Sequence, residues 1–128
     1  MLDCNQTILN NGSTFYYIDA EGLEHSIEQP EAVAKVVESK YTVKVEGLEA
    51  FYKHDKSVHA FISPSGSTSF NTHSDPIDLE IRCLHGRKWM NVAGVIRYVV
   101  GGGQIHIRKN VPHKAINTCY SVCLSWEV

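Results

Sequence analysis

The spacing of hydrophobic residues changes near residue 40. Before it, aromatic and β-branched residues at 14–19 and a second run at 23–27 flank the turn residues 20–22, which predicts a β-hairpin. Pro30 then stands where a helix can begin, because the first helical position needs no N–H donor. Apolar residues recur at helical spacing after it, at Ala32, Val33, Val36 and Val37. The pattern therefore predicts a single helix, from Pro30 to about Ser39.

After residue 40 the pattern becomes one of short apolar runs separated by turn residues. The predicted strands are Tyr41–Val45, Val58–Ser63, Thr68–Asn71, Ile77–Leu84, Lys88–Val92, Val95–Val100, Gln104–Arg108 and Tyr120–Val128. Many short strands at this spacing are typical of a sandwich or a barrel. The pattern thus predicts one domain over residues 1–128, in which an arm of residues 1–40 leads into a β-barrel core of residues 41–128.

Composition and charge argue against several classes of function. The chain has 128 residues, of which 43% are hydrophobic and 20% are charged, so it can form a packed core. Its formal net charge of −2 argues against a nucleic-acid-binding face, and no apolar run approaches the roughly 20 residues of a membrane span. The segment Met1-Leu2-Asp3-Cys4 lacks the features of a secretory signal, so we expect a cytoplasmic protein whose cysteines are reduced thiols.

The candidate chemistry lies in the run Ser67–Pro76, which contains His73-Ser74-Asp75. Alternate residues of an extended segment point to the same face, so His73 and Asp75 can converge on one point. His113 follows a glycine turn and a short strand. Two imidazoles and one carboxylate, with further positions left open, are the ligand set of non-heme Fe(II) oxygenases.

Several motifs resemble the JmjC-type cupin oxygenases, and most closely their ribosomal-oxygenase branch. The resemblance covers about residues 41–128, and its motifs are Tyr41–Leu48, Phe61–Phe70, His73–Leu79, Leu84–Trp89 and Gly102–Asn117. It implies a mainly β fold, the double-stranded β-helix or cupin jelly roll, with the metal inside the barrel and a short helix and a hairpin before it.

The resemblance also implies roles for individual residues. His73, Asp75 and His113 would hold Fe(II). Lys88 would pair with the distal carboxylate of 2-oxoglutarate, and Ser121, a small residue after the second histidine, would help to hold that co-substrate. The family's second motif carries Pro and Gly at the positions of Arg108 and Asn110, so the turn before His113 departs from the pattern.

A four-ligand metal site is the alternative within the same fold, with Glu80 added to His73, Asp75 and His113. Alternation along residues 75–83 argues against it. Asp75 shares its face with Ile77, Leu79 and Ile81, whereas Glu80 falls on the opposite, charged face. Burying the charge of Glu80 without a partner would cost several kcal/mol, which favours three ligands.

Two further patterns concern the pocket. In the last strand Val122, Leu124 and Trp126 alternate with Ser121, Cys123 and Ser125, so we expect the bulky set to pack and the small set to leave room for a ligand. His59 lies in the strand that borders the pocket in relatives, where a contact with the co-substrate is conceivable.

Together these features predict an Fe(II)- and 2-oxoglutarate-dependent hydroxylase. Its substrate would be a small molecule or an exposed protein side chain. Two alternatives stay open: a metallocupin dioxygenase or isomerase that works without 2-oxoglutarate, and a non-catalytic cupin that binds a small ligand or a partner protein. Phe15, Tyr16 and Tyr17 are expected to be exposed on the hairpin, where they would offer an interface for a homodimer.

Overall fold

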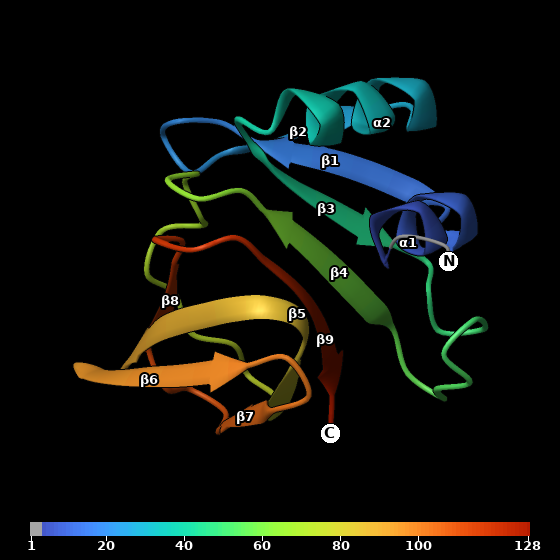
Figure 1. Cartoon of the computed structure of the whole chain (residues 1–128). Helices are drawn as coiled ribbons and strands as arrows, with labels where there is room; N and C mark the ends of the chain where they lie inside the picture. The colour runs from blue at the N-terminus through green and yellow to red at the C-terminus, as the bar shows by residue number, and fades with distance from the viewer. Residues whose placement is uncertain (1–3) are drawn as a thin grey trace.

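The computed structural model describes residues 4–128, and it consists of two β-sheets with two short helices on the outer face of the larger sheet (Figure 1). Residues 1–3, on which the expectation of no secretory signal rests in part, lie outside the described range. The elements are α1 (Cys4–Asn11), β1 (Thr14–Ile18), β2 (Glu24–Ile27), α2 (Gln29–Glu38), β3 (Thr42–Glu46), β4 (Val58–Ser63), β5 (Leu79–Val92), β6 (Val95–Val100), β7 (Gln104–Ile107), β8 (His113–Ile116) and β9 (Ser121–Glu127).

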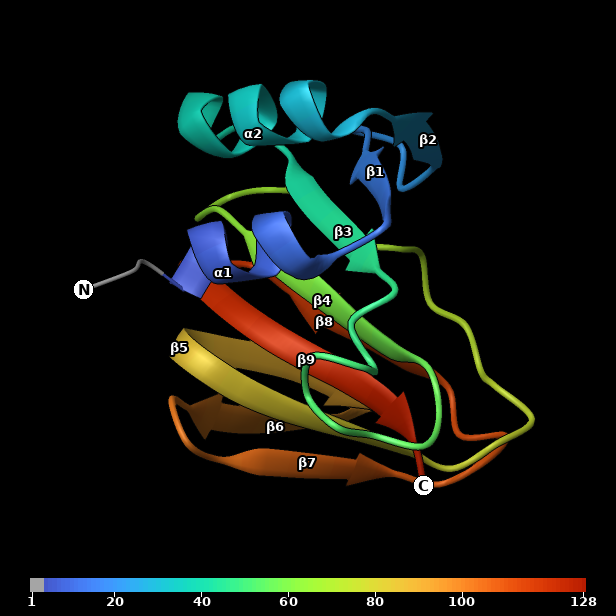
Figure 2. The ribbon, with the colours of Figure 1, turned by 90° about the vertical axis from the view of Figure 1, so that its right-hand side faces the viewer.

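All of these strands pair in an antiparallel manner. The main sheet runs in the order β2-β1-β3-β4-β9, then the first part of β5, then β7. The second part of β5 leaves this sheet and pairs with β6 on one side and β8 on the other, which makes the second sheet (Figure 2). The predicted hairpin is present as β1 and β2, and it extends the main sheet because β1 pairs with β3. This arrangement is the double-stranded β-helix that the resemblance implies.

The bend in β5 joins the two sheets. The register of β5 against β9 shifts between Cys83 and His85, which is the sign of a β-bulge. Gly86 follows with a φ of 79°, in the left-handed region that side chains other than glycine rarely adopt. The sequence pattern predicted two strands separated by a turn at His85-Gly86. That prediction was wrong, because the chain bends there without leaving the sheet.

The two faces of the main sheet carry different groups of side chains. Its outer face packs against the helices through a buried apolar cluster: Ile8, Leu9, Phe15, Ala32, Val43, Val45, Leu48, Val58, Ala60, Ile62, Val122 and Leu124. Its inner face looks toward the second sheet, where a smaller cluster includes Cys83, Met90 and Cys123. The alternation predicted for the last strand is therefore confirmed, with Val122 and Leu124 on one face and Cys123 on the other.

The structure differs from the predicted secondary structure at three further places. Helix α1 was not predicted, because its only strong apolar signal is Ile8-Leu9, and it is the burial of these two side chains against the sheet that stabilises it. Residues 68–71 form no strand, and β8 was not predicted. Helix α2 is present, but Val33 and Val37 are 42% and 80% exposed, so the apolar stripe is only partly used.

The aromatic residues of the hairpin are not an open apolar surface. Phe15 is buried in the outer cluster, so the prediction that it is exposed was wrong. Tyr17 lies beneath the ammonium group of Lys35, 4.6 Å from its ring centre, and Tyr16 lies beneath that of Lys44 at 5.1 Å. The prediction of a homodimer therefore no longer has the exposed aromatic surface on which it was based. Within residues 4–128 neither helix has the length and apolar character needed to cross a membrane.

Replacing Gly86 with alanine is expected to destabilise the protein far more than the matched change at Gly66. Both glycines have a φ near 80°, so each substitution carries a conformational cost of about 1–2 kcal/mol. A Cβ at Gly86 would also lie 2.1 Å from the carbonyl oxygen of Tyr120, whereas a Cβ at Gly66 meets nothing within 4 Å. The overlap should add roughly 1–3 kcal/mol at Gly86 only.

Urea unfolding of Gly86→Ala and Gly66→Ala measures this difference directly. Equal losses of unfolding free energy in the two variants would show that the close approach of β5 to Tyr120 does not constrain the fold.

Candidate metal centre and cavity

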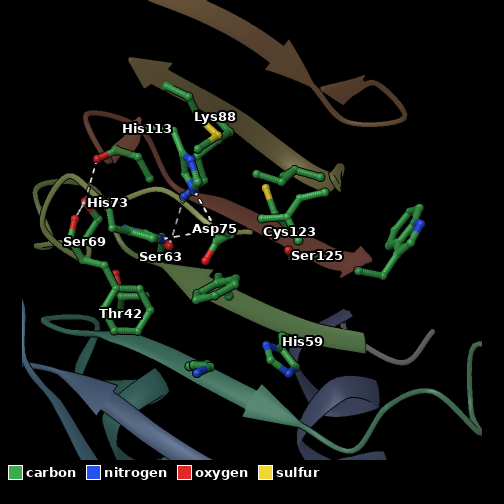
Figure 3. Close-up of a pocket in the computed structure, with 18 of the residues that line it drawn as sticks. Thr42, His59, Ser63, Ser69, His73, Asp75, Lys88, His113, Cys123 and Ser125 are labelled. Carbon is green, nitrogen blue, oxygen red and sulfur yellow. Dashed lines mark hydrogen bonds and ion pairs between the residues drawn. The ribbon is translucent and has the colours of Figure 1, made fainter. Parts of the chain in front are cut away.

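A cavity of about 480 Å³ lies between the two sheets and is lined by side chains from both (Figure 3). Its wall on the main sheet comes from alternate residues of β3, β4 and β9, because in a strand only every second side chain faces the same way. The opposite wall comes from the second part of β5, from β8 and from the segment 69–77. Cys123 and Ser125 line it, so two of the three small residues of β9 form part of the wall, together with Trp126 from the bulky set.

His73, Asp75 and His113 come together at one side of this cavity. Oδ2 of Asp75 lies 3.3 Å from Nε2 of His113 and 3.7 Å from Nε2 of His73. One candidate ligand atom from each residue lies within 4.8 Å of the other two. His113 is buried, Asp75 is half-buried and His73 is exposed. The cluster is therefore enclosed by the barrel at His113 and open to solvent at His73.

Hydrogen bonds from the other ring nitrogens orient both imidazoles. Nδ1 of His73 lies 2.8 Å from the carbonyl oxygen of Asn71, and Nδ1 of His113 lies 3.0 Å from that of Val111. A carbonyl can only accept, so in each ring Nδ1 carries the proton and Nε2 keeps its lone pair. This is the arrangement found in metal-binding histidines, in which a backbone carbonyl sets the tautomer.

The backbone holds the two histidines in place. His73 and His113 form an isolated β-bridge, in which the N–H of each donates to the carbonyl of the other at 3.2 and 2.8 Å. The N–H of Asn110 donates to the carbonyl of Asp75 at 2.6 Å. Asn110 has a φ of 63°, and asparagine tolerates this conformation better than most residues. The departure from the family's glycine at this position is thus compatible with a tight turn.

Glu80 lies outside the cluster. Its carboxylate accepts hydrogen bonds from Gln104 at 3.2 Å and contacts Nδ1 of His106 at 3.1 Å on the outer face of the sheet. The alternation along β5 predicted this outward position. Among the described residues the potential metal ligands are therefore three in number.

Lys88 forms the floor of the cavity. Its side chain is buried, and its ammonium group donates to Oδ1 of Asn117 at 2.7 Å and to Oγ of Ser63 at 3.2 Å. Within residues 4–128 no carboxylate forms an ion pair with it. Burial in this low-dielectric position lowers the pKa of Lys88 below its ordinary value. The neighbouring Arg87 points to solvent, as strand alternation predicted.

Asn117 is a site residue that the sequence analysis missed. Besides accepting from Lys88, its amide donates to the hydroxyl of Thr42 at 3.3 Å and to the carbonyl of Ser67 at 3.2 Å. Strand alternation could have identified it, because Asn117 stands four residues after His113 and alternate residues of a strand share a face. Its partners Lys88, Thr42 and Ser67 come from distant segments, so the local pattern does not indicate these contacts.

Ser121 does not belong to the cavity wall. It is fully buried at the start of β9, where it pairs with Ser63 across the sheet, and it is not among the residues that line the cavity. Its assignment to the co-substrate stays a prediction drawn from the resemblance.

The opposite end of the cavity is also polar. His59 lines it, with Nε2 at 3.6 Å from a carboxylate oxygen of Glu46, and burial lowers the pKa of this imidazole. Lys44 forms ion pairs with Glu24 and Glu46, both at 3.1 Å, so its charge is balanced. Between the two ends the wall is apolar, with Phe61, Phe70, Ile77, Leu79, Ile81 and Met90.

The similarity of this chain to known proteins is found in comparisons of structure. No family model matches this chain, and no curated protein matches it. Among solved structures, the Escherichia coli ribosomal oxygenase YcfD, in complex with cobalt and succinic acid, superposes over 99% of this chain with a TM-score of 0.71 and 12% sequence identity. The superposition covers only 44% of the YcfD chain.

Other solved structures superpose on about two thirds of this chain. A cupin-like protein from Thermotoga maritima matches with a TM-score of 0.54 and 16% identity, over 70% of this chain and 69% of its own. The polyketide cyclase RemF from Streptomyces resistomycificus matches with a TM-score of 0.55 and 16% identity, over 67% and 64%. Likeness at such identities concerns the fold, and on this evidence the chain has the cupin jelly-roll fold.

The buried ammonium of Lys88 should make the stability of the protein depend on pH. The unfolded chain holds this proton up to the ordinary lysine pKa of 10.5, and the folded chain releases it at lower pH. Between these two values the unfolded state binds more protons, so the free energy of unfolding should rise with pH. Lys88→Met should remove this contribution, whereas Arg87→Met, at the exposed neighbour, should retain it.

Urea unfolding of the three proteins at stepped alkaline pH gives this comparison. An identical pH dependence in the protein and in Lys88→Met would mean that the lysine is not held as a buried cation.

Proposed function

We propose that this protein is an Fe(II)- and 2-oxoglutarate-dependent hydroxylase. One observation carries the proposal: Lys88, a buried cation with no acidic partner among residues 4–128, shares a cavity with a His-Asp-His cluster whose two histidine Nε2 atoms can bind a metal. Such a cavity suits a small anion that binds a metal at one end and the ammonium group of Lys88 at the other.

The donor set fits iron. His73, Asp75 and His113 would hold it through two neutral imidazole nitrogens and one carboxylate oxygen. Two histidines and one carboxylate, with positions left for other ligands, are typical of non-heme Fe(II) sites. The side of the cluster at which His73 is exposed offers access for O₂. When bound, Fe(II) with 2-oxoglutarate and O₂ supplies the oxidising chemistry that hydroxylates a C–H bond, with release of succinate and CO₂.

The polar floor of the cavity supports 2-oxoglutarate as the co-substrate. A carboxylate that reaches Lys88 would gain a charge-assisted hydrogen bond and would neutralise the buried ammonium. Asn117 orients the lysine through its Oδ1 and is itself held by Thr42 and Ser67, so the cation is placed before the ligand arrives. That the YcfD structure contains cobalt and succinic acid, a dicarboxylate, is consistent with this assignment.

The other end of the cavity suggests the kind of substrate. Its apolar middle and the imidazole of His59 at its far end suit a small molecule with an apolar body and one polar group, or a single protein side chain of that shape. A specific protein interface would require roughly 800 Å² of surface on each partner. We favour the small molecule because the cavity alone provides its binding surface.

Metal binding should depend on the cluster and not on Glu80. His73→Ala and His113→Ala are expected to abolish binding of Fe(II) under anaerobic conditions, because each removes a donor from a set of three. Glu80→Ala is the matched control from the outer face of β5 and should bind iron as the unmodified protein does. Metal analysis after gel filtration measures this, and equal loss of iron in Glu80→Ala would favour the four-ligand site.

Lys88→Ala should weaken 2-oxoglutarate binding while leaving the metal in place. A charge-assisted hydrogen bond contributes about 1.5–3 kcal/mol, so the affinity should fall by about tenfold to a hundredfold. Anaerobic calorimetric titration of the Fe(II)-loaded protein measures it, with Arg87→Ala as the control that should bind normally. Unchanged affinity in Lys88→Ala would rule out the proposed anchor.

Succinate release in the presence of Fe(II), O₂ and 2-oxoglutarate tests the activity itself. A protein that binds iron at the cluster but neither binds nor consumes 2-oxoglutarate would be a metallocupin of another kind.

A further inference from the structure

Two cysteines lie directly opposite each other on neighbouring strands of the main sheet, beside the cavity. Cys83 of β5 and Cys123 of β9 are direct partners in the antiparallel register. The N–H of Cys83 donates to the carbonyl of Gly103 at 2.9 Å, and its carbonyl accepts from Gly102 at 2.7 Å. Both groups therefore point toward β7 and away from β9, so Cys83 and Cys123 form a non-hydrogen-bonded pair.

This kind of pair has the spacing that a disulfide needs. In non-hydrogen-bonded antiparallel pairs the Cα atoms lie about 4.5 Å apart and the side chains are closer than in the other kind. Disulfides span Cα separations of about 4.4–6.8 Å. Because the two residues are directly opposite, their side chains also share one face of the sheet, the face toward the barrel interior.

The surroundings of the two thiols differ in one respect. Cys83 is fully buried, and its S–H points to the carbonyls of His85 and Gly86 at the β5 bend. Cys123 is buried as well, with 1% of its surface exposed, but its side chain lines the cavity, so of the two sulfurs it is the one that a small solute in the cavity would meet first. The remaining cysteines, Cys4 in α1 and Cys119 in the loop before β9, do not line the cavity.

We propose that Cys83 and Cys123 are a site of reversible oxidation at which hydrogen peroxide closes a disulfide. First the O–O bond breaks as one peroxide oxygen bonds to Sγ of Cys123, which gives a sulfenic acid and one water. Sγ of Cys83 then attacks that sulfur, the S–S bond forms, and the hydroxyl leaves with the proton of Cys83 as a second water. The two thiols lose two electrons and two protons, and peroxide accepts them.

The bond would tie β5 to β9 at the bulge from which β5 passes into the second sheet. It would close a long loop of chain between residues 83 and 123, which restricts the unfolded state more than the folded one. The oxidised protein should therefore unfold at a higher temperature than the reduced protein. A thiol reductant should restore the original state.

The test uses the full chain with Cys4→Ser and Cys119→Ser, so that only the proposed pair remains. Treatment with equimolar hydrogen peroxide should remove both titratable thiols together, lower the intact mass by two hydrogens and raise the unfolding temperature, and dithiothreitol should reverse all three. Adding Cys123→Ser to the same background is the matched control, and it should lose no hydrogen pair. Oxygen added to one sulfur without a cross-link, disulfide-linked dimers, or no reaction would each overturn the proposal.

Peptide mapping of the unmodified chain provides a second measurement that does not depend on these substitutions. Trypsin releases residues 83–87 with Cys83 and residues 115–128 with both Cys119 and Cys123. After peroxide treatment and digestion without reductant, these two peptides should be joined, and fragmentation should place the bond at Cys123. A bond to Cys119 or Cys4 would contradict the assignment.

Discussion

The close approach of Gly86 to the backbone of Tyr120 is the constraint on which the barrel depends. It lets β5 bend at a bulge and continue without a break, so that one strand belongs to both sheets. As a result, Ile81 before the bend and Lys88 after it face the same interior. Without this bend the apolar wall and the cationic floor of the cavity would belong to separate surfaces.

The two ends of the cavity differ in whether their lysine is paired with acidic side chains of the protein. At the outer end Lys44 is paired with two glutamates, and its charge is balanced within the protein. At the floor the partners of Lys88 within the described part of the chain are two neutral oxygens, and its burial is unfavourable unless an anion joins it. In the proposed function an anion relieves this cost at Lys88, and the His73-Asp75-His113 cluster in the same cavity provides the second point of attachment.

The structural neighbours show why the fold alone leaves the activity open. An oxygenase and a polyketide cyclase both superpose on this chain, and all of these matches have low sequence identity. The same jelly roll thus supports different reactions, and the choice among them is made by a few side chains inside the barrel. In the function proposed for this chain those are His73, Asp75, His113 and Lys88.

Much of the architecture was determined by the sequence alone. Alternation along residues 75–83 correctly placed Glu80 outside, and two of the three small residues of the last strand, Cys123 and Ser125, line the cavity as expected. The motif spacing singled out His73, Asp75 and His113 before any contact was known. These features are local, because the alternation of residue types along a strand indicates which of its faces is buried.

The tertiary structure decided what lies opposite each face. Helix α1 exists because Ile8 and Leu9 meet the sheet, and its own short polar sequence carries little sign of this. The contact of Lys88 with Asn117 and Ser63 joins three distant segments, and the bridge that aligns His73 with His113 joins two. The pairing of Cys83 with Cys123 depends on the strand register, which the bulge sets. A local pattern cannot specify such contacts, because each depends on residues far away in the chain that only the folded barrel brings together.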